Sequence, residues 1–221
     1  MKLSAPFCLA SIATLCVLAS SPGESRTAFA ASAPDLTSSV QVPKLRFVLS
    51  PSGSTARYRV RERLVGHDLP NDAIGETKSI TGAISFDSNG KVIPQSSKFV
   101  VDAATFVSDK NRRDGFVRGR LLDADQYPSI VLVPTDVRGI ALPLPTAGSH
   151  PIEVTGNLTV AGVTRPTTWK GAAEFQAGRV AVSAATAFTF DDIQMEQPRV
   201  PVLLSVADTI RLEIDLSLLR Q

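Results

Sequence analysis

The stretch Gly156-Asn157-Leu158-Thr159-Val160-Ala161-Gly162-Val163-Thr164-Arg165-Pro166 predicts two β-strands joined by a tight turn. Leu158 and Val160 alternate with polar Asn157 and Thr159, a pattern typical of a strand with one apolar face. Gly162 suits the turn because it has no Cβ. Arg165, next to the turn, carries a fork of donors that can pair with a carboxylate from elsewhere in the fold.

The same alternation of apolar and polar residues recurs from Lys44 to the end of the chain. It is clearest in the last segment, where Ile210, Leu212, Ile214, Leu216 and Leu218 share one face. We expect about eight strands, with a long Pro-rich loop over residues 139–151. Residues 108–123 break the alternation and predict one short helix, capped by Ser108 or Asp109, with Phe116 turned inward.

Regular hairpins without a second hydrophobic segment predict a single all-β domain, either an antiparallel barrel or a sandwich. A barrel is favoured because the last strand is long and apolar on one face, so it would be a hazardous free edge. A barrel of about eight strands is either filled by its side chains or holds one small ligand. Small residues at inward positions indicate a hollow lumen, although they can also make room for large neighbours: Gly82, Gly156, Gly171, Ala173 and Ala184.

The first thirty residues predict a signal peptide rather than part of the fold. Lys2 precedes an apolar run at residues 7–19, and Ala28-Phe29-Ala30 matches a cleavage site that would leave Ala31 as the first residue. The run is shorter than the ~20 residues of a membrane-spanning helix. We therefore divide the chain into a signal peptide (1–30), a flexible lead (31–44) and a β-barrel domain (45–221), and expect a periplasmic or secreted protein.

Composition and charge argue against nucleic-acid binding. The formal net charge is +2 and the basic residues are scattered, without the basic stripe and stacking aromatic residues of a nucleic-acid surface. The one basic cluster, at residues 110–120, is interpreted as the solvated face of a short helix. Both cysteines, Cys8 and Cys16, lie in the predicted signal peptide, so the mature protein would contain no disulfide.

The residues that usually carry catalysis or metal binding form no recognisable set. His67 and His150 are the only histidines, and both lie in predicted loops. Neither has a recognisable set of carboxylates that would complete a metal or catalytic site. No nucleophile elbow or phosphate-binding glycine loop is present. The sequence predicts no catalytic residue, no metal site and no cofactor, and we expect a protein that is not an enzyme.

Three motifs in order resemble the YceI-like family of exported bacterial proteins. They are Arg113-Asp114 with Asp123, Tyr127-Pro128, and the string from Gly156 to Pro166 quoted above. The resemblance implies a lipocalin-like antiparallel barrel with one short helix that binds polyisoprenoids or other long amphiphiles. It covers most of the predicted domain.

Two sets of residues are candidates for ligand contact on this basis. Arg113, Asp114 and Arg165 are expected at one end of the barrel, either binding a polar head group or tying the helix to the hairpin. Glu62 is in phase with Ala56, Tyr58 and Val60, so its carboxylate either points inward, where it needs a partner, or lies past the rim. The candidates for the lumen wall, each of which can equally be plain core, are Tyr58, Val60, Ile84, Phe86, Phe99, Phe106, Phe116, Tyr127, Leu158 and Trp169.

The sequence thus predicts an exported protein that sequesters or carries a long-chain amphiphile, such as an isoprenoid, a quinone or a fatty-acid derivative. Transient contact with a membrane and a homodimer are both compatible with this interpretation. Two alternatives stay open. One is a lipocalin-like enzyme or stress-response factor that acts on a small amphiphile, with Glu62 or a histidine as acid or base. The other is an interaction module whose lumen is filled.

Overall fold

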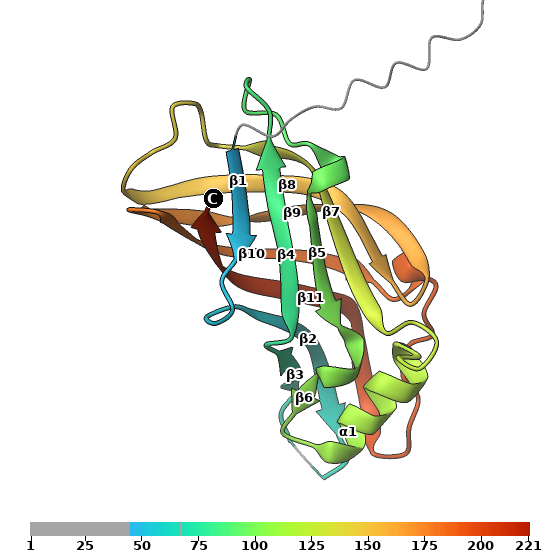
Figure 1. Cartoon of the computed structure of the whole chain (residues 1–221). Coiled ribbons are helices and arrows are strands. Elements are labelled where there is room, and N and C mark those ends of the chain that lie inside the picture. Colours follow the sequence, from blue (N-terminus) through green and yellow to red (C-terminus); the bar gives the residue numbers. More distant parts are fainter. Residues whose placement is uncertain (1–44, 67) are drawn as a thin grey trace, which may run out of the picture. The chain divides into compact units, whose positions relative to one another are not determined.

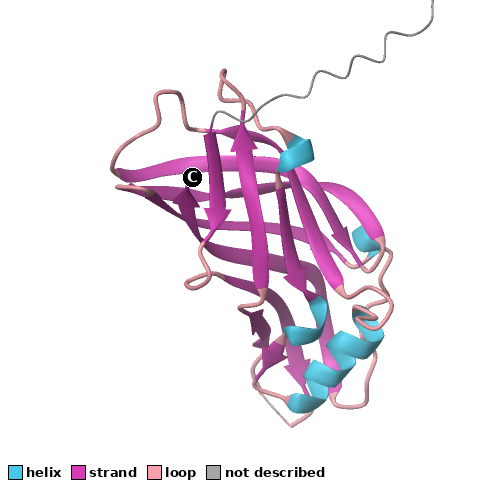
Figure 2. Ribbon diagram, in the orientation of Figure 1, coloured by secondary structure: helices cyan, strands magenta, loops and turns pink. Residues whose placement is uncertain are grey.

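The computed structural model describes residues 45–66 and 68–221, and the predicted signal peptide and flexible lead lie outside them. The described chain is mostly strand, with short helical segments at the ends of the barrel (Figure 2). The strands are β1 Leu45–Leu49, β2 Thr55–Leu64, β3 Asn71–Thr77, β4 Ile80–Phe86, β5 Lys98–Asp102, β6 Val107–Ser108, β7 Ser129–Arg138, β8 Gly148–Val160, β9 Val163–Gln176, β10 Arg179–Thr189 and β11 Leu203–Arg220. The helical segments are α1 Asn111–Phe116, η1 Pro94–Ser96, η2 Ala103–Thr105, η3 Val117–Leu121 and η4 Asp191–Ile193.

The strands form one antiparallel sheet that closes on itself, as predicted. Its order is β1-β4-β5-β7-β8-β9-β10-β11-β2-β3-β6, and a further pairing of β1 with β11 closes the ring (Figure 1). The closed ring therefore contains eight strands. In the closed ring both edges of the long strand β11 are paired, one with β10 and the other with β2 and β1. No long apolar strand is therefore left with a free edge that could pair with another chain.

The remaining strands β2, β3 and β6 extend the wall of the barrel rather than forming a second sheet. β1 and β2 both pair with β11, one after the other, with Leu49 opposite Leu218 and Thr55 opposite Asp215. Residues 50–54 interrupt this line, and the Ser54 hydroxyl oxygen accepts the Ser217 N–H at 3.0 Å across the gap. β3 and β4 likewise follow one another opposite β2 and β1. Segments that are separate along the chain thus act as long, bent strands.

The helical segment lies where the sequence predicts it, but the predicted cap is wrong. α1 runs directly into η3, a single π-helical turn, and together they lie at one end of the barrel (Figure 1). The N-cap residue of α1 is Lys110, whose side chain makes no capping hydrogen bond. Ser108 and Asp114 instead bond to each other, because the Asp114 carboxylate accepts both the Ser108 N–H (2.8 Å) and its hydroxyl (2.6 Å).

The loop predicted over residues 139–151 is shorter than expected. β7 continues to Arg138 and β8 begins at Gly148, so His150 lies on a strand rather than in a loop. Its ring packs edge-on against Phe175 at 5.8 Å.

No helix among the described residues is long and apolar enough to cross a membrane.

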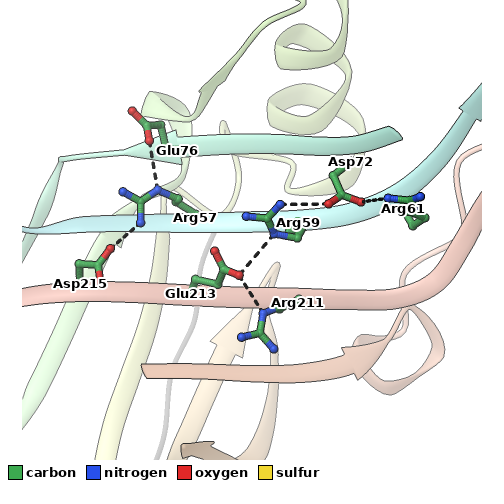
Figure 3. A network of polar contacts seen from close by, with 8 residues as sticks. All are labelled: Arg57, Arg59, Arg61, Asp72, Glu76, Arg211, Glu213 and Asp215. Carbon is green, nitrogen blue, oxygen red and sulfur yellow. Dashed lines mark hydrogen bonds and ion pairs between the residues drawn. The ribbon is translucent and has the colours of Figure 1, made fainter. Parts of the chain in front are cut away.

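The outer face of β3, β2 and β11 carries a ladder of ion pairs (Figure 3). Arg57 pairs with Glu76 and Asp215, and Arg59 with Asp72 and Glu213. The ladder places opposite charges on neighbouring strands at every second residue, which favours this register. It also keeps the outer face polar while the alternating residues, such as Tyr58 and Val60, turn inward.

Candidate ligand-binding cavities

The inward faces of the strands enclose two cavities stacked along the barrel. The large cavity has a volume of about 1080 Å³ and lies at the end that carries α1; the small cavity has about 400 Å³. On β11, Leu212 lines the large cavity and Ile214 lines the small one. On β7, Ile130 lines the large cavity and Leu132 lines the small one. The two cavities contradict the alternative of a lumen filled by its own side chains.

The wall of the large cavity is apolar except on one side. The apolar part is supplied by strands β2, β3, β7, β8, β10 and β11, by α1 and η3, and by the irregular segments before β6 and β11. It includes Val60, Phe106, Phe188, Ile210 and Leu212. The charged lining residues come from only two places, Glu62 at the end of β2 and residues 109–113 at the start of α1. A long chain with one polar end matches this distribution, because apolar walls take the chain and polar groups orient the head.

A buried ion pair forms the polar side of the large cavity. The Arg113 guanidinium donates to a Glu62 carboxylate oxygen at 2.6 Å and also binds Asp109. The Glu62 side chain is 7% exposed and also accepts a hydrogen bond from the Asn71 amide at 3.3 Å. Glu62 therefore points inward with a partner, which is the arrangement that a buried carboxylate needs. The alternative position past the rim is wrong.

Tyr58 lies in the same wall. Its ring packs against Phe106 at 5.7 Å and covers Gly75, whose missing side chain leaves room for it. Burial raises the pKa of the Tyr58 hydroxyl to about 12, while the positive charge of Arg113 opposes the shift. The phenol is therefore neutral at physiological pH and can donate a hydrogen bond to a head group.

The small cavity has an almost entirely apolar wall. Trp169 is 3% exposed and its indole N–H is satisfied within the wall by the Thr167 hydroxyl at 3.1 Å. The segment between β7 and β8, including Ile140, Leu142 and Leu144, covers the open end of this cavity. The small cavity offers space for hydrocarbon and few partners for a polar group.

Most of the predicted wall residues line one of the cavities. Whether they contact a ligand stays a prediction. Tyr58, Val60, Phe106 and Phe116 line the large cavity, and Ile84, Phe86, Phe99 and Trp169 line the small one. Leu158 is 2% exposed but lines neither cavity, so it is core. Tyr127 lines neither cavity, and its ring covers Gly162 in the β8–β9 turn instead.

The predicted polar cluster of Arg113, Asp114 and Arg165 is divided among different partners. Arg113 binds Glu62, and Asp114 binds Ser108. Arg165 pairs with Asp192 in η4 at 2.9 Å and lies over the Phe188 ring at 5.4 Å. The expected pairing of helix with hairpin is therefore wrong, because Arg165 reaches the segment after β10 rather than α1.

The interpretation of the inward glycines is also corrected. A Cβ on Gly171 would lie 1.9 Å from the Ser183 carbonyl oxygen, and one on Gly156 would lie 2.6 Å from that of Val133. A Cβ on Gly82 would lie 2.3 Å from the Lys98 carbonyl oxygen. These glycines therefore let neighbouring strands approach and bend, and do not leave empty volume. Ala173 and Ala184 do line the small cavity.

Sequence reasoning missed the segment between β10 and β11. Phe190, Ile193, Met195, Val200 and Val202 line the large cavity, although this segment contains no regular strand. Periodicity cannot identify wall residues in an irregular segment. The available signal was the apolar run Val200-Pro201-Val202-Leu203 directly before the last strand.

The described residues contain no group of three or more His, Cys, Asp or Glu side chains that could hold a metal ion. His67 lies outside the described residues.

Residues 47–218 match the family model described as the YceI-like domain. This chain belongs to the YceI-like family. Two curated relatives, both named UPF0312 protein and both from Pseudomonas putida strains, are 30% identical over 133 residues, which is 56% of this chain. The chain spans 64% of the length of these relatives.

Three solved structures share this fold. A polyisoprenoid-binding domain from Saccharophagus degradans, implicated in plant cell wall breakdown, superposes with a TM-score of 0.61 at 14% identity and covers 80% of this chain and 100% of that domain. BcnA from Burkholderia cenocepacia gives a TM-score of 0.57 at 17% identity, covering 76% and 98%. The Campylobacter jejuni YceI protein gives 0.54 at 17% identity, covering 69% and 88%. At these identities the likeness shows the fold.

Proposed function

We propose that this protein binds a long-chain amphiphile, such as an isoprenoid, a quinone or a fatty-acid derivative, inside the barrel. The large cavity takes most of the chain, and Glu62, Arg113 and Tyr58 meet the polar head. The observation that carries the proposal is an apolar cavity of about 1080 Å³ with a single charged side. The structural likeness to a domain described as polyisoprenoid-binding supports the same ligand class.

The energetics of burial support such a ligand. Each methylene that leaves water contributes about 0.8 kcal/mol, so about ten of them offset the several kcal/mol that association costs. The volume of the large cavity is at the upper limit of ordinary ligand pockets, which are about 300–1,000 Å³. A ligand of this kind needs no covalent step and no cofactor.

Native mass spectrometry of the protein purified from a bacterial periplasm tests the proposal. We expect a bound species with a mass in the lipid range. A protein that stays free of ligand in several hosts, and that takes up neither a fatty acid nor an isoprenoid alcohol in vitro, would contradict it. An activity assay beside these spectra tests Glu62 as an acid or base. If Glu62 acts in this way, Glu62→Gln abolishes a measured turnover while the spectra still show lipid uptake.

A matched pair of variants identifies the cavity that holds the chain. Ala73 is buried in the wall of the large cavity and Ala173 in that of the small one. We expect Ala73→Trp to weaken binding of cis-parinaric acid by at least about tenfold, because the indole occupies the space of the chain. Ala173→Trp should have a smaller effect. The reverse order would place the chain in the small cavity.

We also propose that the protein is exported. The apolar run and the Ala28-Phe29-Ala30 site in the sequence support this. The expected result is a periplasmic or secreted protein whose intact mass corresponds to a chain starting at Ala31. A cytoplasmic protein of full-length mass would contradict the proposal.

A further inference from the structure

Four large apolar side chains are exposed together at one end of the barrel. Val65 and Leu69, in the connection after β2, are 56% and 78% exposed, and Val202 and Leu204, beside the start of β11, are 56% and 58% exposed. The two segments are joined by a hydrogen bond from the Val65 N–H to the Val202 carbonyl at 3.0 Å. We call these four residues the apolar tip. A patch of this kind marks a surface that meets another apolar partner.

The apolar tip is continuous with the large cavity. Val65 and Val202 line that cavity although more than half of each side chain is exposed, so the cavity wall reaches the surface here. Leu69 and Leu204 extend the same surface outward and are not part of the wall. In Figure 1 the start of β11, the β2–β3 connection and α1 lie together at the lower end of the barrel.

Several charged residues are exposed that either lie close in sequence to the apolar tip or line the large cavity. The basic residues are Arg63, Lys110, Arg112 and Arg199, and the acidic ones are Asp68, Asp109 and Glu196. Asp109 is occupied by Arg113 and Lys110. Among the described residues no ion pair engages Arg63, Arg112 or Arg199, and none engages Asp68 or Glu196. The unpaired charges therefore carry a small positive excess, and the three guanidinium groups are available to anions. Long basic side chains can lay their stems on apolar surface while the charge reaches phosphate groups.

We propose that the apolar tip docks on a lipid bilayer that contains anionic phospholipid, and that the ligand enters or leaves the large cavity there. This inference rests on the proposed function, because a long-chain amphiphile resides in membranes and its free concentration in water is very low. A mouth that is itself apolar lets the chain pass from the bilayer to the cavity without crossing water. Four half-exposed side chains give weak and reversible attachment, which suits a carrier.

Vesicle flotation tests the docking surface. The purified protein is mixed with vesicles of phosphatidylcholine and phosphatidylglycerol, and the floated fraction is compared with that of Leu69→Asp/Leu204→Asp. We expect the double variant to lower the partition coefficient at least about tenfold, because carboxylates resist entry into the interface. Leu219→Asp is the matched control, since Leu219 is 36% exposed on the same strand as Leu204, at its opposite end. It should float like the wild type.

The proposal is overturned if the wild type does not float, or if the double variant and Leu219→Asp float equally. It is also overturned if the double variant changes only the oligomeric state measured by light scattering, since the tip would then join two copies of the chain. Circular dichroism checks that each variant is folded.

A second measurement separates this inference from the proposed function. Cis-parinaric acid added from ethanol reports binding in the cavity without a membrane. If both proposals hold, the double variant binds it like the wild type but extracts it from vesicles at least about tenfold more slowly. Tip-dependent flotation by a wild type that does not bind cis-parinaric acid would retain the docking surface and reject the proposed function.

Discussion

The ion pair of Arg113 with Glu62 contributes the charged part of the wall of the large cavity. Arg113 is part of the Arg-Asp motif, and its side chain, 13% exposed, holds a carboxylate that would otherwise be buried without a cation. The pair places charge in an otherwise apolar wall. A buried pair of this kind adds little net stability, because the loss of hydration offsets the attraction.

Removing one partner should therefore cost far more than removing both. We expect Arg113→Met to lower the free energy of unfolding by about 3–5 kcal/mol, because Glu62 is left without its cation. The double variant Glu62→Leu/Arg113→Met should recover most of that loss. Urea unfolding of the single and double variants measures the difference. Equal losses would mean that Arg113 stabilises the fold through Asp109 rather than Glu62.

The other motif residues act at a corner of the barrel. The Tyr127 ring covers Gly162, whose φ of +79° favours glycine, so the Tyr-Pro motif packs on the Gly-Val-Thr string. The hydroxyls of Thr159 and Thr164 bond across the same hairpin at 2.8 Å. The motifs that carry the resemblance to the family therefore mainly stabilise the fold, and only Arg113 and Val160 among these motif residues line a cavity.

Among the elements, β9 and β10 illustrate how glycine shapes the barrel. Gly171 lies opposite Ala184 in the ladder, and its Cα is so close to β10 that no side chain fits. Such close approach lets the long strands coil without losing their hydrogen bonds. The neighbouring inward residues on β10, Val182 and Val180, line the small cavity together with Ala184.

Two glycine variants separate this steric effect from the general cost of glycine. Gly171→Ala should lower the free energy of unfolding by about 1–3 kcal/mol or more, because its Cβ overlaps the β10 backbone. Gly115→Ala in α1 should be neutral or stabilise by up to about 1 kcal/mol, since a Cβ there meets nothing within 4 Å. Thermal and urea unfolding measure both. A stabilising Gly171→Ala would refute the close approach of the strands.

For the whole molecule, the ion-pair ladder in Figure 3 links stability to pH. Hydrogen bonds from Arg61, Arg211 and Arg57 lower the pKa values of Asp72, Glu213 and Asp215, respectively. The folded state therefore binds protons less readily than the unfolded chain at these groups. Their contribution is complete above the unfolded pKa values of about 4 and is lost as the pH falls through the lower folded values.

We accordingly expect the free energy of unfolding to decline as the pH drops below about 5, with a smaller decline in high salt because the pairs are partly exposed. Asp215→Asn should flatten this acid limb and cost only about 0.2–1 kcal/mol at neutral pH. Urea unfolding at several pH values measures the profile. A stability that rises toward low pH would contradict the assignment of these pairs.

The sequence by itself determined the class of fold. Period-two alternation specifies which residues face inward along each strand, and a long apolar last strand needs partners on both edges, so a closed antiparallel sheet follows. The inward direction of Tyr58 and Val60 could be predicted in the same way, and that of Phe116 from the predicted helix. The break in alternation over residues 108–123 predicted the position of the helix.

Only the tertiary structure decided what the interior contains. Alternation gives direction but not distance, so it cannot tell a glycine that leaves space from Gly171, which a neighbouring backbone crowds. Alternation also cannot predict that Arg165 pairs with Asp192, or that the irregular segment before β11 lines the large cavity. Both depend on residues brought together across the barrel. Cavities and their mouths arise from contacts between distant segments, and a local pattern carries no information about those distances.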